Sequence, residues 1–378
     1  AGRRGRPGVI ATLLGDDPIE AYYSLRPEEF FNRPPEPGFV EPSNREIAKL
    51  HLAALALQKG SIGVEELPGP LAAVLEDLAN VGVIKVLGRK IIVSARAASQ
   101  FVEARGLRST GPMARLYHGG RRVGEREMPM ALYDLHPGAV YYHGGRVYLS
   151  ASFDLNSLRV ELRPLPEGVS FYTKPLYDID VKEVSGEDSR LAGPVRLVYG
   201  DVHVVVSVKG YVIRDELSGS VISEVYYENP LTWDYWTKGV MLKYPLLDFD
   251  STEQGLSAYH ALEHVLISAS RPIVGASDTD LSGVSYPTGH IVIYDSHVGG
   301  NGASRLVFER LEDVQDMAEV IVSSCSCEDG CPKCVFSPYC GNNNRYLSRR
   351  GALRVLRALR TAEEQKLESI PRGGLRAA

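Results

Sequence analysis

Hydrophobic positions near the start of the chain recur at helical spacing and then switch to short runs. Two sets of apolar residues predict two helices: Ile47, Leu50, Ala54 and Leu57, then Leu71, Val74, Leu75 and Leu78. Ser43 and Glu46 have the spacing of a capping box before the first helix. The two apolar runs of GVIKVLGRKIIVS, joined by Gly88 and Arg89, predict a tight hairpin. Helices followed by a basic hairpin are typical of a winged helix, which we expect over residues 44–110.

A different pattern covers residues 111–248. Short runs rich in Val, Tyr and Ile alternate there with turns of Gly, Pro, Asp and Asn. This pattern predicts a β-rich domain made of short strands, as a small barrel or sandwich. Its tyrosines could stack on nucleobases, but half-buried strand residues are the interpretation that we favour.

The two ends of the chain have mixed patterns. VIATLL, bounded by Gly8 and Gly15, predicts a buried strand over residues 9–14, with a helix from Pro18. Four prolines between residues 33 and 43 predict a linker. After Phe249, SAYHALEHVLISAS predicts an amphipathic helix, and GHIVIYDSHVGGNGASRLVFERL predicts a strand, a glycine loop and a helix. We therefore expect a multidomain α+β protein.

Composition limits the classes of function. The 378 residues are 44% hydrophobic and 24% charged, with a net charge of −5, so the protein is not a globally basic nucleic-acid binder, although local basic patches remain open. No apolar run reaches the ~18 residues of a membrane helix, and no signal peptide is evident. The expected location is the cytoplasm or the nucleoid. The first residue is not Met, so we expect a fragment of a longer protein.

All five cysteines lie in CSCEDGCPKCVFSPYC, residues 325–340. Cys331 and Cys334 have the two-residue gap of a zinc knuckle, and Cys325 and Cys327 form a second pair just upstream. Four thiolates at about 2.3 Å from one ion would make a closed, structural zinc site. A redox C-x-x-C pair and an iron–sulfur cluster are the alternatives. On spacing alone, Cys340 could replace Cys325 as a ligand.

Two groups of basic residues are candidates for nucleic-acid contact. Lys85, Arg89 and Lys90 belong to the predicted wing, where they would contact phosphates or form the solvated turn of a protein-docking winged helix. A predicted arginine-rich helix from Asn344 contributes the second group, Arg345, Arg349 and Arg350, of which we expect Arg349 and Arg350 to be exposed. Its basic face would meet DNA phosphates or be solvated.

Two further motifs give weaker signals. His260 and His264 stand four residues apart, but no Glu follows the first histidine as in H-E-x-x-H, so we interpret both as structural. Gly299-Gly300-x-Gly302 before a helix resembles a phosphate cradle. Because it lacks a lysine and the full glycine fingerprint, we interpret it mainly as a tight strand-to-helix turn.

The order of these segments resembles that of MrfA-like superfamily 2 DNA helicases over nearly the whole chain. Ala1-Gly2-Arg3 matches the end of helicase motif VI, and residues 1–32 resemble the end of a second RecA-like domain. ALEHVL, YDSHVGGNGASRLVFERL and CSCEDGCPKC, within residues 249–378, resemble the MrfA zinc-binding domain. The resemblance places zinc on Cys325, Cys327, Cys331 and Cys334 rather than Cys340. It also gives Arg3 a catalytic contact with the nucleotide.

The resemblance implies ATP-driven 3′–5′ translocation on single-stranded DNA, in DNA repair. ATP and Mg²⁺ would be cofactors of the full-length parent only, and the partners would be its own N-terminal helicase core and repair proteins. The chain contains no G-x-x-x-x-G-K-[ST], so we expect the C-terminal half of a helicase, inactive alone. The alternative is a non-catalytic, zinc-stapled protein-docking module. A cysteine hydrolase or redox enzyme has little support, because no cysteine has a base partner nearby in sequence.

Overall fold

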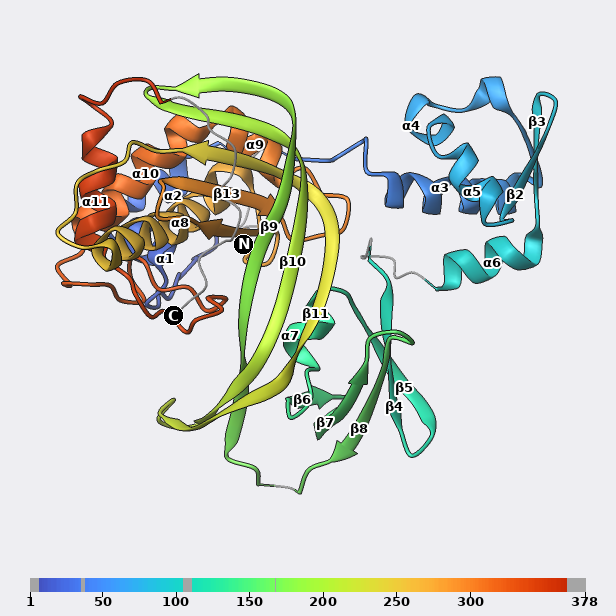
Figure 1. The fold of residues 1–378 in the computed structure, drawn as a ribbon, viewed down its shortest axis with the longest axis horizontal. Coiled ribbons are helices and arrows are strands. Elements are labelled where there is room, and N and C mark those ends of the chain that lie inside the picture. The colour runs from blue at the N-terminus through green and yellow to red at the C-terminus, as the bar shows by residue number, and fades with distance from the viewer. Residues whose placement is uncertain (1–6, 35–37, 105–110, 167, 366–378) are drawn as a thin grey trace.

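The computed structural model describes residues 7–34, 38–104, 111–166 and 168–365. These residues form a small helical unit, a small sheet and a larger α/β body, and three long curved strands run from the body toward the small sheet (Figure 1). The predicted class, a multidomain α+β protein with a β-rich, barrel-like domain and a C-terminal α/β region, is confirmed, and the long sheet is curved into a half-barrel.

The small helical unit has the elements of the predicted winged helix. It contains α3 (Arg45–Lys59), β1 (Ser61–Gly63), a 3₁₀ turn (Val64–Glu66), α4 (Gly69–Ala72), α5 (Leu75–Asn80), β2 (Ile84–Leu87), β3 (Lys90–Val93) and α6 (Ala95–Glu103). Its three strands are ordered β1-β3-β2. Gly88, with φ of +61°, starts the predicted turn between β2 and β3. Leu52, Leu78 and Ile91 are fully buried in the core of this unit.

The helix cap differs from the prediction. Asn44, not Ser43, precedes α3, and its side-chain oxygen accepts hydrogen bonds from the backbone N–H groups of Glu46 and Ile47. Ser43 instead donates its backbone N–H to Glu41. Asn44 also donates to the backbone oxygen of Val298, so the cap attaches the helical unit to the larger body.

A five-stranded sheet follows in the chain. It consists of β4 (Met113–His118), β5 (Arg121–Glu127), β6 (Val140–His143), β7 (Arg146–Asp154) and β8 (Arg159–Pro164), with α7 (Met130–Asp134) between β5 and β6. The strand order is β5-β4-β8-β7-β6, and β4 and β8 run parallel. These short strands agree with the sequence pattern.

The remaining strands are far longer than predicted. They are β9 (Phe171–Ala192), β10 (Val195–Asp215) and β11 (Val221–Lys243). Burial alternates along nearly all of β10, so one face stays covered over its full length. Both neighbours of β10 shift register between Val208 and Gly210, which bends the sheet without ending it. The prediction of short strands was therefore wrong for residues 171–243.

The C-terminal region completes this sheet and covers it with helices. β12 (Leu281–Ser285) and β13 (His290–Asp295) extend it in the order β12-β13-β11-β10-β9, so it crosses residue 248, the predicted domain limit. The helices are α8 (Thr252–Val274), α9 (Ala303–Glu309), α10 (Leu311–Ser324) and α11 (Arg349–Ala358). They bury one continuous core against the sheet. The predicted domain limits stay a prediction.

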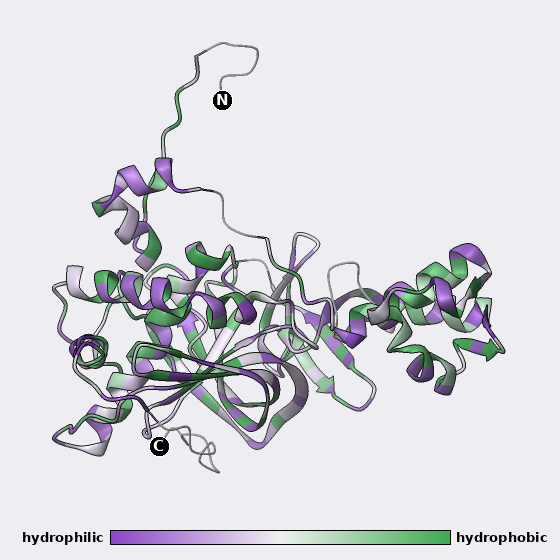
Figure 2. Cartoon of the chain, turned by 90° about the horizontal axis from the view of Figure 1, so that it is seen from above, coloured by the Kyte–Doolittle hydropathy of each residue, from purple (hydrophilic) through white to green (hydrophobic). Residues whose placement is uncertain are grey.

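The N-terminal segment differs from the prediction. Residues 7–15 are extended but pair with no strand among the described residues, and Val9 and Leu13 are each 94% exposed. An apolar run is buried as a strand only when neighbouring strands cover it. The segment extends away from the body before α1 (Pro18–Leu25) and α2 (Pro27–Asn32), as Figure 2 shows. No described helix is both long and apolar enough to cross a bilayer.

Candidate metal centre and nucleic-acid interface

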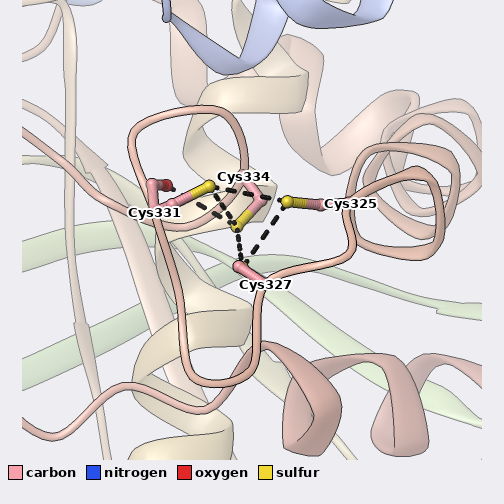
Figure 3. A group of neighbouring side chains, drawn as sticks. All are labelled: Cys325, Cys327, Cys331 and Cys334. Atoms are coloured by element: carbon pink, nitrogen blue, oxygen red, sulfur yellow. Dashed lines mark hydrogen bonds between the residues drawn. The ribbon is translucent and has the colours of Figure 1, made fainter.

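Four cysteine side chains converge where the chain leaves α10. Cys325 is the residue after the last turn of this helix, and Cys334 is buried against the core. The four Sγ atoms point toward one another (Figure 3). Sγ–Sγ separations are 3.5 Å for Cys325–Cys327, Cys325–Cys331 and Cys327–Cys334, and 3.7 Å for Cys331–Cys334.

These separations fit one tetrahedral zinc ion. Four sulfurs at about 2.3 Å from a central ion stand about 3.8 Å apart, close to the observed separations. The backbone N–H groups of Cys334 and Phe336 both donate to the oxygen of Cys331, which forms the knuckle turn. Burial raises the pKa of the Cys334 thiol, and raises that of Cys327 to about 11. A bound cation would displace these protons, so the site suits a metal that binds thiolates.

Arg349 supports this cluster from inside. It is 7% exposed, its Nε donates to the backbone oxygen of Cys327 at 2.7 Å, and its Nη1 donates to that of Val322 at 2.7 Å. We expected Arg349 to be exposed on a basic face, and this is wrong. The helix begins only after Ser348, so Arg349 falls at its first turn, facing the cysteine loop.

The other two arginines of this group differ in setting. Arg345 pairs with Glu224 of β11, whose charge raises the pKa of Arg345. Arg350 is exposed and lies 3.3 Å from Glu328. Arg357 near the end of α11 and Arg360 just after it share Glu319. The helix therefore presents a largely neutralised surface.

The wing carries exposed basic side chains that have no ion-pair partner among the described residues. Lys85, Arg89 and Lys90 are all exposed around the β2–β3 turn. None of them forms an ion pair within the described ranges of the chain. Arg3, expected at the nucleotide, lies outside the described residues.

The glycine loop is closed by the protein's own carboxylate. Asp295 lies at the end of β13. Its carboxylate accepts hydrogen bonds from the backbone N–H groups of Asn301 and Gly302 at 2.9 Å and of Ser304 at 2.7 Å. These donors are the groups that a phosphate would need. The loop is therefore a strand-to-helix turn, as the missing lysine indicated.

Cys340 lies apart from the other cysteines. Its Sγ is 3.7 Å from Nε2 of His260 and forms a group with His260 and His264. From sequence we interpreted both histidines as structural, and Cys340 had no role once the other four cysteines were taken as the zinc ligands. Two histidines four residues apart on a helix, with one cysteine left over, were the available signal.

Comparison with known proteins agrees with this architecture. The family model of the MrfA Zn-binding domain matches residues 262–335, which include the four clustered cysteines. The ATP-dependent helicase YprA of Bacillus subtilis is 27% identical over 359 residues, covering 89% of this chain and 46% of that protein. The uncharacterised protein MJ1572.1 of Methanocaldococcus jannaschii is 30% identical over 109 residues, covering 26% of this chain and 97% of that protein.

One solved structure shares the fold. The crystal structure of the DUF1998 helicase MrfA is similar over 85% of this chain and 46% of that chain, with a TM-score of 0.51 and 20% identity. This chain therefore spans less than half the length of the helicases that it matches.

Proposed function

Since the chain belongs to the MrfA-like helicase family and corresponds to the C-terminal region of those helicases, we propose that it is their DNA-engaging accessory part. In this role it guides single-stranded DNA at the helicase motor, and a zinc site stabilises it.

The zinc site is structural in this proposal. Zinc is supported by the matched domain and by the four-cysteine cluster. Cys325, Cys327, Cys331 and Cys334 are its ligands, and four thiolates leave no open position on the ion for catalysis. The metal instead holds the loop between α10 and α11 in its fold, together with the core packing of Cys334 and Val335.

The unpaired charge of the wing is the observation that carries the DNA-binding proposal. Lys85, Arg89 and Lys90 project from one short hairpin, with no carboxylate to neutralise them among the described residues. Such groups bind phosphates and carry little sequence information. Arg350 adds one exposed charge, and Arg345 would first have to leave Glu224. Arg349 is buried and does not take part.

The longer parent would supply the chemistry. Arg3 belongs to its nucleotide site, with ATP and Mg²⁺ bound by an N-terminal helicase core, and the motor moves 3′–5′. DNA repair is the process, repair proteins are partners, and the location is the cytoplasm or the nucleoid. The name of YprA, an ATP-dependent helicase, supports an ATP-driven motor in the parent. The predicted domains, including the winged helix over 44–110 and the zinc-binding domain over 249–378, are part of the proposal.

A salt titration of single-strand binding tests this function. A variant with Arg89→Ala and Lys90→Ala should bind a labelled oligonucleotide more weakly, with the log–log salt slope reduced by about one unit or less per lost contact. Removing Arg121 and Arg163, two exposed arginines of the small sheet, is the matched control and should leave the slope unchanged. Unchanged affinity and slope in the wing variant, with the zinc retained, would refute DNA binding through the wing.

The second candidate is a protein-docking module. The net charge of −5 and the paired arginines in and around α11 favour it. Complete failure to bind DNA at low salt, in protein that retains its zinc, would decide for this alternative.

A further inference from the structure

A second cluster of potential metal ligands joins helix α8 to Cys340, beyond the four-cysteine cluster in the chain. The ligand atoms of His260, His264 and Cys340 all lie within 4.8 Å of one another. We propose that these three side chains bind a second divalent transition-metal ion, Zn²⁺ or its substitute Co²⁺. The proposal is independent of the DNA-binding function.

The two histidines are held in the tautomer that a metal requires. Nδ1 of His260 lies 3.1 Å from the backbone oxygen of Tyr346, and Nδ1 of His264 lies 2.7 Å from that of Val335. A carbonyl oxygen can only accept, so each neutral ring carries its proton on Nδ1. Both Nε2 atoms therefore present lone pairs. Metal-binding histidines are usually fixed in this way by a second partner.

The separation between the Cys340 sulfur and the nearer histidine nitrogen fits two ligands of one ion. Sγ of Cys340 lies 3.7 Å from Nε2 of His260. For one tetrahedral ion with ordinary Zn–S and Zn–N bonds, the expected separation is about 3.6 Å. The backbone N–H of Asn344 points at the same sulfur at 3.2 Å, as amides do around metal-bound thiolates. His264 and Cys340 are buried, so little rearrangement is needed to collect the ligands.

The fourth position of this ion would be open. All three ligands line one cavity of about 410 Å³, together with Tyr177, Glu263 and Asn342. Glu263 is buried on the same helix, between the two histidines in sequence. A site with three protein ligands and a free position takes water or a small anion, in contrast to the closed four-cysteine site. Two nitrogens and a sulfur select zinc-like ions over Mg²⁺ and Ca²⁺.

A histidine–cysteine pair could also be a reactive nucleophile without any metal. Of the two histidines, only His260 would contact Cys340 in that case, and the lone pair on Nε2 of His264 would have no part in the chemistry. The fixed lone pair of His264 therefore favours the metal, and thiol chemistry distinguishes the two.

Metal stoichiometry of the full chain tests the proposal. After purification in zinc-containing buffer, elemental analysis should give two zinc ions per chain, and one in His260→Gln and in Cys340→Ser. His51→Gln, which removes an exposed histidine of α3, should retain two. Titration of the apo protein with Co²⁺ should give two spectral components, of which the variants keep only the more intense, thiolate-rich one. That retained component also shows that a variant is folded.

Thiol alkylation is the second measurement. Cys340 should react with iodoacetamide after chelation, and restored Zn²⁺ should protect it in the wild type but not in His260→Gln, in which the four-cysteine site still binds zinc. One metal per chain in the saturated wild type would overturn the proposal. Two metals in both variants, or alkylation of Cys340 that Zn²⁺ does not slow, would do the same.

Discussion

Nδ1 of His264 lies 2.7 Å from the backbone oxygen of Val335, the residue directly after the zinc-site cysteine Cys334. This contact joins the longest helix of the body, α8, to the cysteine loop. Val335 and Cys334 are themselves part of the main core. The metal centre therefore holds a core element in place, and its loss should disturb more than the loop.

Replacing one cysteine of the four-cysteine cluster should remove zinc and unfold part of the C-terminal region. Cys331→Ser leaves three thiolates. The free energy of metal binding in such sites stabilises the folded state directly, because the unfolded chain has no preformed site. We expect loss of that zinc ion and greatly increased hydrogen exchange over α8, α10 and α11, measured by elemental analysis and mass spectrometry. Cys340→Ser is the control. It should keep the four-cysteine zinc, and equal damage in both variants would show that the ligand set is wrong.

Arg349 and its neighbour provide a matched pair. Arg349→Ala removes two charge-assisted hydrogen bonds and leaves the buried oxygens of Cys327 and Val322 without this donor. We expect a loss of about 3 kcal/mol in unfolding free energy. Arg350→Ala, at an exposed position, should change it by no more than about 0.5 kcal/mol. Urea unfolding measures both, and similar small effects would mean that the Arg349 contacts contribute little.

Local patterns predicted the fold where contacts are local. The β2–β3 hairpin needed only apolar runs around Gly88, and the four-cysteine cluster needed only close spacing in sequence. The length of strands β9 to β11 was not predicted, because it depends on partners that lie far along the chain, including β12 and β13. The same limit concealed the Cys340 cluster, since His260 lies 80 residues away from Cys340. The prediction that Arg349 is exposed was wrong because its burial depends on where the helix begins. An arginine-rich sequence does not reveal that position.

Gly302 should resist substitution more than an ordinary turn glycine. Its φ is +99°, and an added Cβ would lie 2.9 Å from the backbone carbon of Val40. Gly302→Ala should therefore cost about 2 kcal/mol or more, because the linker backbone cannot move away cheaply. Gly219 has a φ of +66°, but an added Cβ would meet no atom within 4 Å. Gly219→Ala should therefore cost only about 1 kcal/mol, from backbone strain alone. Thermal unfolding of the two variants compares them, and equal losses would mean that the linker yields.

The Asp280–His297 pair should make stability depend on pH. The hydrogen bond from His297 lowers the pKa of Asp280 to about 2, and the same bond raises the pKa of His297, with Glu127 and Asp295 adding negative charge nearby. Asn301 and the backbone N–H of Ser277 also donate to Asp280. The pair joins the start of β12 to the glycine loop.

The signs of the two shifts define a pH window. The lowered pKa of Asp280 contributes stability that is present above about pH 4 and is lost as the pH falls toward 2. The raised pKa of His297 contributes stability that is present below about pH 6.5 and is lost as the pH rises through its folded value. In His297→Gln, the deficit in unfolding free energy should thus be largest between about pH 4 and 6.5 and shrink on either side. Urea midpoints from pH 3 to 9 measure this, with His51→Gln as the control for an exposed histidine. A deficit that stays constant across the range would show that His297 acts through packing and not through its charge.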